Sequence, residues 1–358
     1  MKITMKLMML MTGVLTASIL ICGGFAYADT IIVSPGESIQ DAIDTALATD
    51  TVEVREGVYD LDAVITMKDE VDLVAQYVSA GYPEVRVKAR IVAASGTSVE
   101  PVKLEGIYVD VFDFGDVGVE IPAGSQYVLI KNVIVRANNN DGITLDTASD
   151  VTIESSTVDV SNNIAGDSCI DSADSIYTAE NNILTLEDPS IENANAIESD
   201  NDNVTLEYNC ILGKLSPVTL AHKGTLFASP GYEDKINGDF RLAMAGTDPQ
   251  SAEYYRTSSI AFDSGDPASD LSWEIQIADN NEAIDLGAYG NTRYTAVTTL
   301  PADFDLDGDA DVNDLNLWKS NRFTIGKTFF DGDTNGDGDV DVNDLNIWKS
   351  HRFTTVPQ

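Results

Sequence analysis

A repeat of strand-like segments limits most strongly what this chain can fold into. Four segments begin at Val128, Val151, Tyr177 and Val204 and read VLIKNVIV, VTIESSTV, YTAENNIL and VTLEYNCI. Asn, Asp, Ser and Gly, the residues of tight turns, separate them. A period of 23 to 27 residues with several short strands is typical of a β-solenoid. The repeat therefore predicts an all-β fold of stacked coils.

A second column supports the same register. Ile143, Ile170 and Ile197 are spaced by 27 residues and are predicted to stack in the core. Residues 100–215 show no helical periodicity, which disfavours a doubly wound α/β fold. Cys169 and Cys210 fall in different columns, so we expect two separate buried thiols rather than a disulfide.

The first 28 residues have the pattern of a signal peptide. Two lysines precede an apolar run over residues 7–21, and Ala26-Tyr27-Ala28 gives a small-x-small cleavage site. The apolar run is short, and no other stretch approaches the roughly 20 residues that a membrane span needs. We therefore expect a secreted protein with no membrane span in its mature chain.

The start of the mature chain adds a helix to the solenoid. Ile39, Ala42, Ile43 and Ala46 have helical spacing and predict a short amphipathic helix, and residues 51–54 predict a strand that ends at Gly57. With the repeat columns, residues 30–215 resemble the right-handed parallel β-helix of the pectin lyase-like superfamily. The resemblance implies an N-terminal capping helix on a solenoid over 29–215. It indicates no single reaction, because that fold carries lyases, hydrolases, esterases and non-enzymes.

Residues 216–296 differ from the repeat. Three segments, at 237–242, 260–267 and 283–290, resemble the C-terminal cap of many secreted bacterial β-helix proteins. Such a cap is expected to cover the last coil, whose unpaired strand edges would otherwise template aggregation. A short linker over 297–302 follows it.

Two calcium-binding loops form the strongest motif. Residues 303–314 and 333–344 match at an offset of 30 and follow the EF-hand loop, with oxygen ligands at positions 1, 3, 5, 7, 9 and 12 and Gly at position 6. A helix is predicted after each loop. The predicted ligands of two Ca²⁺ ions are Asp303, Asp305, Asp307, Asp309, Asp311 and Asp314, then Asp333, Asn335, Asp337, Asp339, Asp341 and Asp344.

Two departures from the ordinary EF-hand identify the module. Position 12 is Asp rather than Glu, and no helix enters either loop. Both features resemble type I dockerin modules, over 303–354 of a tail that runs to 358. The resemblance implies docking to a cohesin domain of a scaffold or cell-surface protein, as in a cellulosome. A calcium module that anchors the protein without a cohesin stays an alternative. The implied partner-binding residues are Val312, Asn313, Lys319, Ser320, Val342, Asn343, Lys349 and Ser350.

Charge and composition exclude several functions. The formal net charge of −38 disfavours nucleic acid and anionic membranes as partners, because both would repel the protein. The chain has only two histidines, His222 and His351, which argues against a Ser-His-Asp hydrolase or a His-rich zinc enzyme.

Acidic columns on the solenoid are the candidate catalytic residues. The register places Lys131, Glu154, Glu180 and Glu207 on successive coils about 4.8 Å apart, on an outward face. Asp171 and Glu198 form a second pair. This spacing suits a glycosidase carboxylate pair or a calcium site that holds a uronate, and a solvated acidic face is the alternative. Asn182 and Asn209 are predicted to form a hydrogen-bonded ladder at a turn.

The sequence thus predicts a secreted β-helix protein that acts on polysaccharide and carries a calcium-dependent dockerin. The reaction stays open between β-elimination and glycoside hydrolysis. The alternative is a non-catalytic carbohydrate-binding or surface-structural β-helix displayed by the same dockerin.

Overall fold

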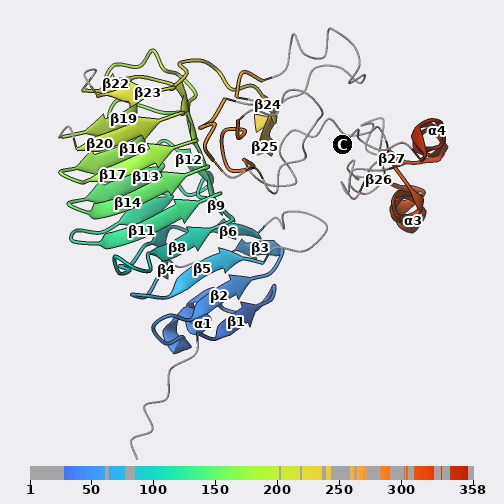
Figure 1. Cartoon of the computed structure of the whole chain (residues 1–358), viewed down its shortest axis with the longest axis horizontal. Coiled ribbons are helices and arrows are strands. Elements are labelled where there is room, and N and C mark those ends of the chain that lie inside the picture. Colours follow the sequence, from blue (N-terminus) through green and yellow to red (C-terminus); the bar gives the residue numbers. More distant parts are fainter. Residues whose placement is uncertain are drawn as a thin grey trace, which may run out of the picture.

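Three parallel sheets form a solenoid (Figure 1). The computed structural model describes residues 28–60, 64–76, 85–200, 203–217, 220–235, 239–242, 259–261, 264–269, 271, 283–290, 302, 304, 310–325, 332 and 339–353. Each sheet takes one strand from each coil, and seven sets of three strands follow one another. This arrangement confirms the predicted parallel β-solenoid, which is of the right-handed type.

The sheets are named by their order along a coil. Sheet A contains β1 (Thr30–Val33), β2 (Thr51–Val54), β5 (Asp72–Ala75), β8 (Val102–Glu105), β11 (Gln126–Lys131), β14 (Ser149–Glu154), β17 (Tyr177–Glu180), β20 (Val204–Glu207) and β23 (His222–Lys223). Sheet B contains β3 (Gly57–Asp60), β6 (Val85–Lys88), β9 (Ile107–Asp110), β12 (Ile134–Asn138), β15 (Thr157–Ser161), β18 (Ile183–Leu186) and β21 (Cys210–Leu212). Sheet C contains β4 (Ile65–Thr66), β7 (Ile91–Val92), β10 (Val119–Ile121), β13 (Ile143–Asp146), β16 (Ser168–Ala173), β19 (Asn195–Ser199) and β22 (Leu215–Ser216).

The predicted register is confirmed in both columns. In sheet A, Val128, Val151, Tyr177 and Val204 lie opposite one another on successive strands. In sheet C, Ile143, Ile170 and Ile197 do the same, and all three are fully buried in one core cluster. Full burial of an isoleucine contributes about 1.5–3 kcal/mol, so the inward columns supply much of the stability of the solenoid.

Helix α1 (Ile39–Thr45) lies at the N-terminal end of the solenoid (Figure 1). The Ser38 hydroxyl accepts a hydrogen bond from the Asp41 N–H and so caps the helix. Ile39 and Ile43, at helical spacing, are fully buried in the solenoid core. The predicted helix is therefore present, and its apolar face joins the first coil to the core.

The turn from sheet A to sheet B carries the predicted ladder. Each of four coils turns through one residue with positive φ: Asn132, Ser155, Asn181 or Tyr208. The next residue points inward, and Asn182 Nδ2 donates to Asn209 Oδ1 at 3.0 Å. Asn209 Oδ1 also accepts from the backbone N–H of Asn182, and Asn182 Oδ1 accepts from that of Ser156. Both asparagines are fully buried, and their amides replace the backbone bonds that the sharp turn removes.

The described residues of 216–228 continue the solenoid through β22, β23 and a bridge between Leu226 and Cys210, and the later described parts, up to residue 290, pack on the outer face of sheet B and on the turn before it. Phe240 of β25 (Asp239–Leu242), which pairs with β24 (Tyr232–Asp234), packs with Ala288 against Ile134. Ala261, Leu242 and Leu286 cover Ile183 and Cys210. The sequence predicts a cover over the last coil; β23 and Leu226 stack on that coil, and the later described parts cover a side face as well. They do so because sheet B presents apolar side chains outward there.

Other sequence expectations are met or lie outside the described residues. Cys169 and Cys210 are free and buried, as expected. The signal peptide, except Ala28, and the linker, except Ala302, lie outside the described residues. Within the described part of the chain, no helix is long and apolar enough to cross a membrane.

The C-terminal tail has an internal two-fold pattern. Helices α3 (Val312–Asn321) and α4 (Val342–His351) follow the two predicted loops, and β26 (Thr324–Ile325) pairs with β27 (Asp339–Val340). Trp318 Nε1 donates to the Asp341 carbonyl, and Trp348 Nε1 donates to the Asp311 carbonyl. Each helix thus packs its tryptophan against the start of the other helix.

Candidate functional site

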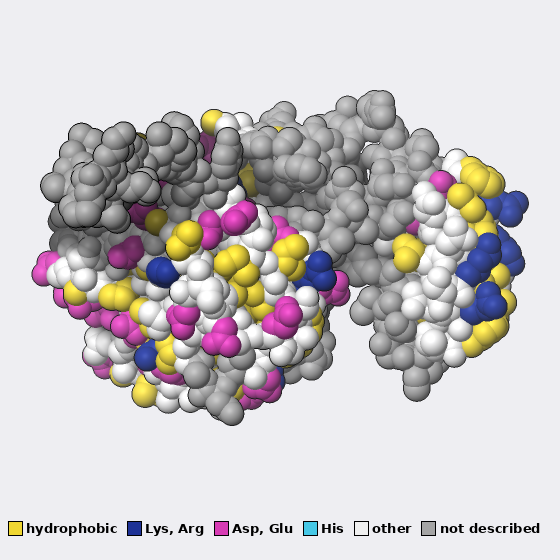
Figure 2. Space-filling view, turned by 90° about the horizontal axis from the view of Figure 1, so that it is seen from below, with side chains coloured by type: hydrophobic (Ala, Val, Ile, Leu, Met, Phe, Trp, Pro, Cys, Tyr) yellow, Lys and Arg dark blue, Asp and Glu magenta, His cyan; other side chains and the backbone are white. Residues whose placement is uncertain are grey.

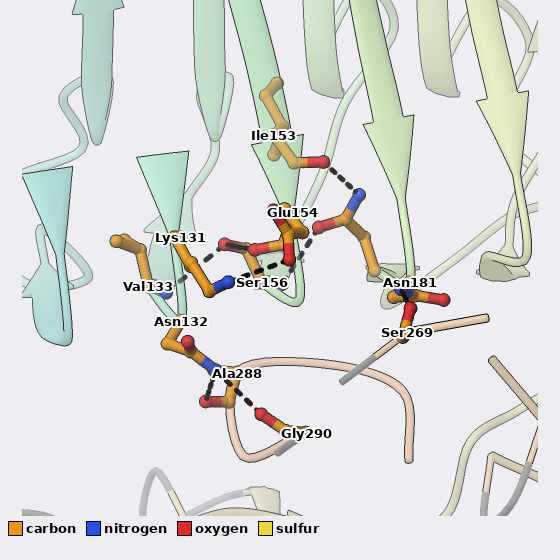
Figure 3. Close-up of polar contacts among 11 residues, drawn as sticks. Lys131, Asn132, Val133, Ile153, Glu154, Ser156, Asn181, Ser269, Ala288 and Gly290 are labelled. Atoms are coloured by element: carbon orange, nitrogen blue, oxygen red, sulfur yellow. Dashed lines mark hydrogen bonds and ion pairs between the residues drawn. The ribbon is translucent and has the colours of Figure 1, made fainter. Parts of the chain in front are cut away.

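The outer column of sheet A has the predicted register but is largely neutralised by ion pairs. Lys131, Glu154, Glu180 and Glu207 lie opposite one another on successive strands. Lys131 Nζ lies 2.9 Å from Glu154 Oε1 (Figure 3). At the other end, Lys223 Nζ lies 3.3 Å from Glu207 Oε2. Lys131 is therefore an ion-pair partner here, and Glu180 occupies the middle of the column.

Glu180 meets a carboxylate that sequence reasoning missed. Asp266, from the C-terminal segment, joins Glu180 and Glu207 in a group whose ligand atoms lie within 4.8 Å of one another. Burial raises the pKa of Glu180, and the nearby Asp266 charge and hydrogen bond raise it further. Carboxylates at this distance repel one another, and a proton, a cation or solvent relieves the repulsion.

Asn181 holds the segment that brings Asp266 to the column. Asn181 Oδ1 accepts a hydrogen bond from the Asp266 N–H at 2.8 Å, and its Nδ2 donates to the Ser269 hydroxyl at 3.0 Å (Figure 3). Two coils earlier, Asn132 Nδ2 donates to the Ala288 and Gly290 carbonyls. Two of the turn residues with positive φ, Asn132 and Asn181, thus bind the chain's own C-terminal segment. The middle of the sheet A column lies beside that docking place.

Sheet C carries the second predicted pair. Asp171 and Glu198 lie opposite each other on β16 and β19. Burial raises the pKa of Asp171, and the negative charges of Glu198 and Asp200 raise it further. Asn195 Nδ2 donates to Glu198 Oε2 at 3.1 Å and holds that carboxylate in place. The two acids therefore share a partly desolvated face.

Asp141 is the acid in this group that sequence reasoning missed. It lies just before β13, and its Oδ1 accepts a hydrogen bond from the Ser168 N–H at 2.6 Å. Burial raises the pKa of Asp141 to about 7, and the charges of Asp171, Asp167 and Glu198 contribute to the rise. Burial also raises the pKa of Asp167. We call Asp141, Asp167, Asp171 and Glu198 the sheet C acid cluster.

The sheet C acid cluster has the elements of general acid–base chemistry. Asp141 titrates near neutral pH, so it holds a proton that it can give to a leaving group. Asp171 lies on the neighbouring strand β16, opposite Thr144 and three residues along from Asp141, and it is near enough for its charge to raise the Asp141 pKa. Strongly perturbed carboxyl groups gathered on one face are typical of functional sites.

Most residues of the two predicted calcium loops lie outside the described residues, and the predicted ligands with described side chains are at the C-terminal ends of the loops. Asp311 and Asp314 belong to the first loop, and Asp341 and Asp344 to the second. The side chains of the other eight predicted ligands lie outside the described residues. Asp314 and Asp344 are fully buried, and each forms a capping box with the Asp three residues earlier. Buried carboxylates at position 12 are hard oxygen donors, and they fit a calcium ion.

The eight predicted partner-binding residues are exposed on α3 and α4. Val312 and Val342 are each 53% exposed at the first turn of their helices. The space-filling view shows apolar and basic side chains gathered on the described face of the tail (Figure 2). Apolar residues with lysines on an otherwise acidic chain are suited to contact with another protein.

Comparisons with known proteins find only distant likenesses in structure. No family model matches the chain, and no curated protein matches it. A pectate lyase, Bsp165PelA from Bacillus sp. N165 in complex with trigalacturonate, aligns with a TM-score of 0.37 and 11% identity, over 57% of this chain and 83% of that chain. The pectate lyase Pel9A aligns with a TM-score of 0.24 and 12% identity, over 74% and 97% of the two chains. ORF18 of Geobacillus virus E2 aligns with a TM-score of 0.30 and 15% identity, over 49% of this chain and 48% of that chain. Similarities this weak carry no argument about what this chain does.

Proposed function

We propose that this protein is a secreted, pectin lyase-like β-helix protein that cleaves polysaccharide at the sheet C acid cluster. The observation that carries the proposal is Asp141, the pKa of whose carboxyl group is raised to about 7 by burial and by the charges of Asp171, Asp167 and Glu198. Such a group is protonated in a useful fraction of molecules at neutral pH. The pair Asp171 and Glu198 on the adjacent strands supplies the ionisable partner.

Glycoside hydrolysis is the reaction that this arrangement supports best. Asp141 acts as the general acid that protonates the glycosidic oxygen. Asp171 or Glu198 acts as the base or nucleophile on the other side of the bond. Two carboxyl groups whose surroundings give them different pKa values are the requirement for this chemistry.

β-Elimination from a uronate-containing polysaccharide is the second candidate. Asp171 lies close enough to Glu198 and Asp200 for both charges to raise its pKa, and three such carboxylates provide the hard oxygens that calcium takes. A calcium ion there would offset the repulsion between this acidic protein and an acidic polymer. The elimination would also need a base, and Lys131 is committed to Glu154 on a different sheet.

We further propose that the tail is a calcium-dependent dockerin and that α1 caps the N-terminal end of the solenoid. Two calcium ions would be held by the twelve predicted ligands, with Asp314 and Asp344 closing the loops. The exposed faces of α3 and α4 would bind a cohesin. The supporting observation is the two-fold pattern of capping boxes and tryptophan contacts.

The test is digestion of a panel of plant and algal polysaccharides by the full chain. New reducing ends without unsaturated products are expected for hydrolysis, and unsaturated products indicate elimination. Asp141→Asn should lower the rate by about 10²–10⁴-fold, the usual contribution of a general acid. The matched control is Asp146→Asn, an exposed position at the end of the same strand, which should keep wild-type activity.

Three results would overturn the proposal. Equal activity of Asp141→Asn and wild type would remove the acid cluster from the mechanism. Loss of activity in the Asp146→Asn control would show that surface charge, not a positioned acid, matters. No product from any polysaccharide in the panel would favour the non-catalytic alternative, a binding or surface-structural β-helix.

A further inference from the structure

A groove on the outer face of sheet B lies apart from the acidic sites. Its volume is about 390 Å³. The C-terminal segment at Ser229, Pro230 and Tyr232 forms one wall, and residues that follow β9 and β15 form the other. We call it the sheet B groove. Its volume is in the usual range for ligand sites.

The sheet B groove is long and narrow. Arg136, Thr185 and Leu212 line it and occupy one outward column of β12, β18 and β21, with Asp159 of β15 between the first two. Four successive strands at about 4.8 Å give a length of about 14 Å. A volume of about 390 Å³ over that length leaves room for an extended chain rather than a compact molecule.

The charges in the groove balance. Lys235 Nζ lies 2.6 Å from Asp159 Oδ1, and Asp159 is fully buried beneath the groove. The Thr185 and Ser161 hydroxyls also donate to Asp159. On the wall, Glu187 offsets Arg136 and accepts a hydrogen bond from the Asn162 N–H. Two positive and two negative groups therefore leave the site close to neutral.

The position of the Arg136 guanidinium is fixed by an aromatic ring. The guanidinium lies over the Phe112 ring, 4.1 Å from the ring centroid. Stacking fixes the planar fork of donors, so less side-chain entropy is lost when the fork binds. Asn162 and Glu187 add an amide and a carboxylate on successive coils. The groove thus offers both donors and acceptors.

We propose that the sheet B groove binds a neutral, extended saccharide chain. Hydroxyl groups both donate and accept, so they match a lining of mixed donors and acceptors with no net charge. A polyanion finds no excess of positive charge there, on a chain of net charge −38. A peptide would pair with strand edges, and in sheet B neighbouring coils occupy those edges. This site is separate from the sheet C acid cluster and does not depend on catalysis there.

The experiment is calorimetric titration of the full chain carrying Asp141→Asn, so that the proposed cleavage does not consume the ligand. The ligands are cellohexaose, xylohexaose, mannohexaose and laminarihexaose, with trigalacturonate and a neutral Gly-Ser hexapeptide as comparisons. At least one neutral hexasaccharide should bind. Adding Arg136→Met should weaken that binding about tenfold or more, since charged hydrogen bonds are the strong ones. Ser229→Trp, which fills the groove from the opposite wall at an exposed position, should weaken it as well.

Lys103→Met is the matched control, because it removes a cation from sheet A, far along the coil from the groove. It should leave the affinity unchanged. Circular dichroism confirms the fold of each variant. The proposal is overturned if no neutral hexasaccharide binds. It is also overturned if the Arg136→Met and Ser229→Trp variants bind the hexasaccharide as tightly as the Asp141→Asn protein does. Preferred binding of trigalacturonate or of the peptide would also overturn it.

Discussion

Replacing Asp141 by Asn should make the solenoid more stable at pH 8 and change little at pH 4. The pKa of the Asp141 carboxyl is 3.8 in an unperturbed chain and about 7 in the folded protein. The folded protein therefore holds this proton more tightly than the unfolded chain does. The free energy of unfolding of the wild-type protein therefore carries no penalty from Asp141 below pH 3.8. This penalty grows as the pH rises from about 4 to 7, and it stays constant above that.

The expected size of the effect follows from the two pKa values. At about 1.4 kcal/mol for each pKa unit, the difference between 3.8 and about 7 sets an upper limit of about 4 kcal/mol. Because the carboxyl is only partly buried, solvent screens its repulsion, and about 2 kcal/mol is the expected penalty at pH 8. Asn keeps the oxygen that accepts from the Ser168 N–H, so the variant loses the penalty but not the hydrogen bond.

The assay is urea unfolding of the solenoid, followed by its far-ultraviolet circular dichroism between pH 4 and 8. Asp167 and Asp171, whose pKa values are also raised, remain in both proteins and largely cancel in the difference. The Asp146→Asn variant serves again as the control and should show no pH-dependent gain. A gain that is the same at pH 4 and pH 8, or a variant less stable than wild type at pH 8, would refute the reasoning.

The other predictions concern the core, the ladder, the sheet A column and the tail. Ile170→Asp should abolish soluble protein, since it buries an unpaired charge in the inward column of sheet C, and normal yield would contradict this. Asn209→Ala should cost about 1–3 kcal/mol in urea unfolding, because Asn182 loses its partner; an unchanged midpoint would argue against the ladder. Glu180→Gln should leave polysaccharide cleavage unchanged and raise stability at neutral pH, because burial and then the Asp266 charge raise the pKa of Glu180 and so penalise its ionised form; lost activity would return this column to the candidate sites. Adding a chelator should shift the tryptophan fluorescence of the tail and leave the unfolding transition of the solenoid unchanged. A fluorescence spectrum insensitive to calcium would refute metal-dependent folding of the tail.

Local pattern predicted the solenoid well, and physical reasons explain what it missed. The columns of Val128 and Ile143 were predictable because each coil repeats the same inward positions. The contact of Asp266 with Glu180 was not predictable, because the two residues are 86 positions apart in the sequence and no local spacing indicates that they meet. Asp141 lies in a turn outside the strand columns, and its desolvation depends on the coils stacked around it.

Placement of the C-terminal segment shows the same limit. The apolar residues Ile134 and Ile183 on the outer face of sheet B signal that something covers this face. Nothing in the sequence says which segment does so. The calcium loops stay a prediction from spacing alone, and such a prediction is possible because a metal site built from one short loop is encoded locally.

The central claim is that polysaccharide is cleaved on sheet C. A crystal structure of the Asp141→Asn protein with an oligosaccharide from the polysaccharide it degrades tests this directly. The expected result is a sugar chain lying across β13, β16 and β19, with a glycosidic oxygen within hydrogen-bond distance of the residue 141 side chain. A sugar chain bound only on another face, with none at Asp171 and Glu198, would contradict the claim.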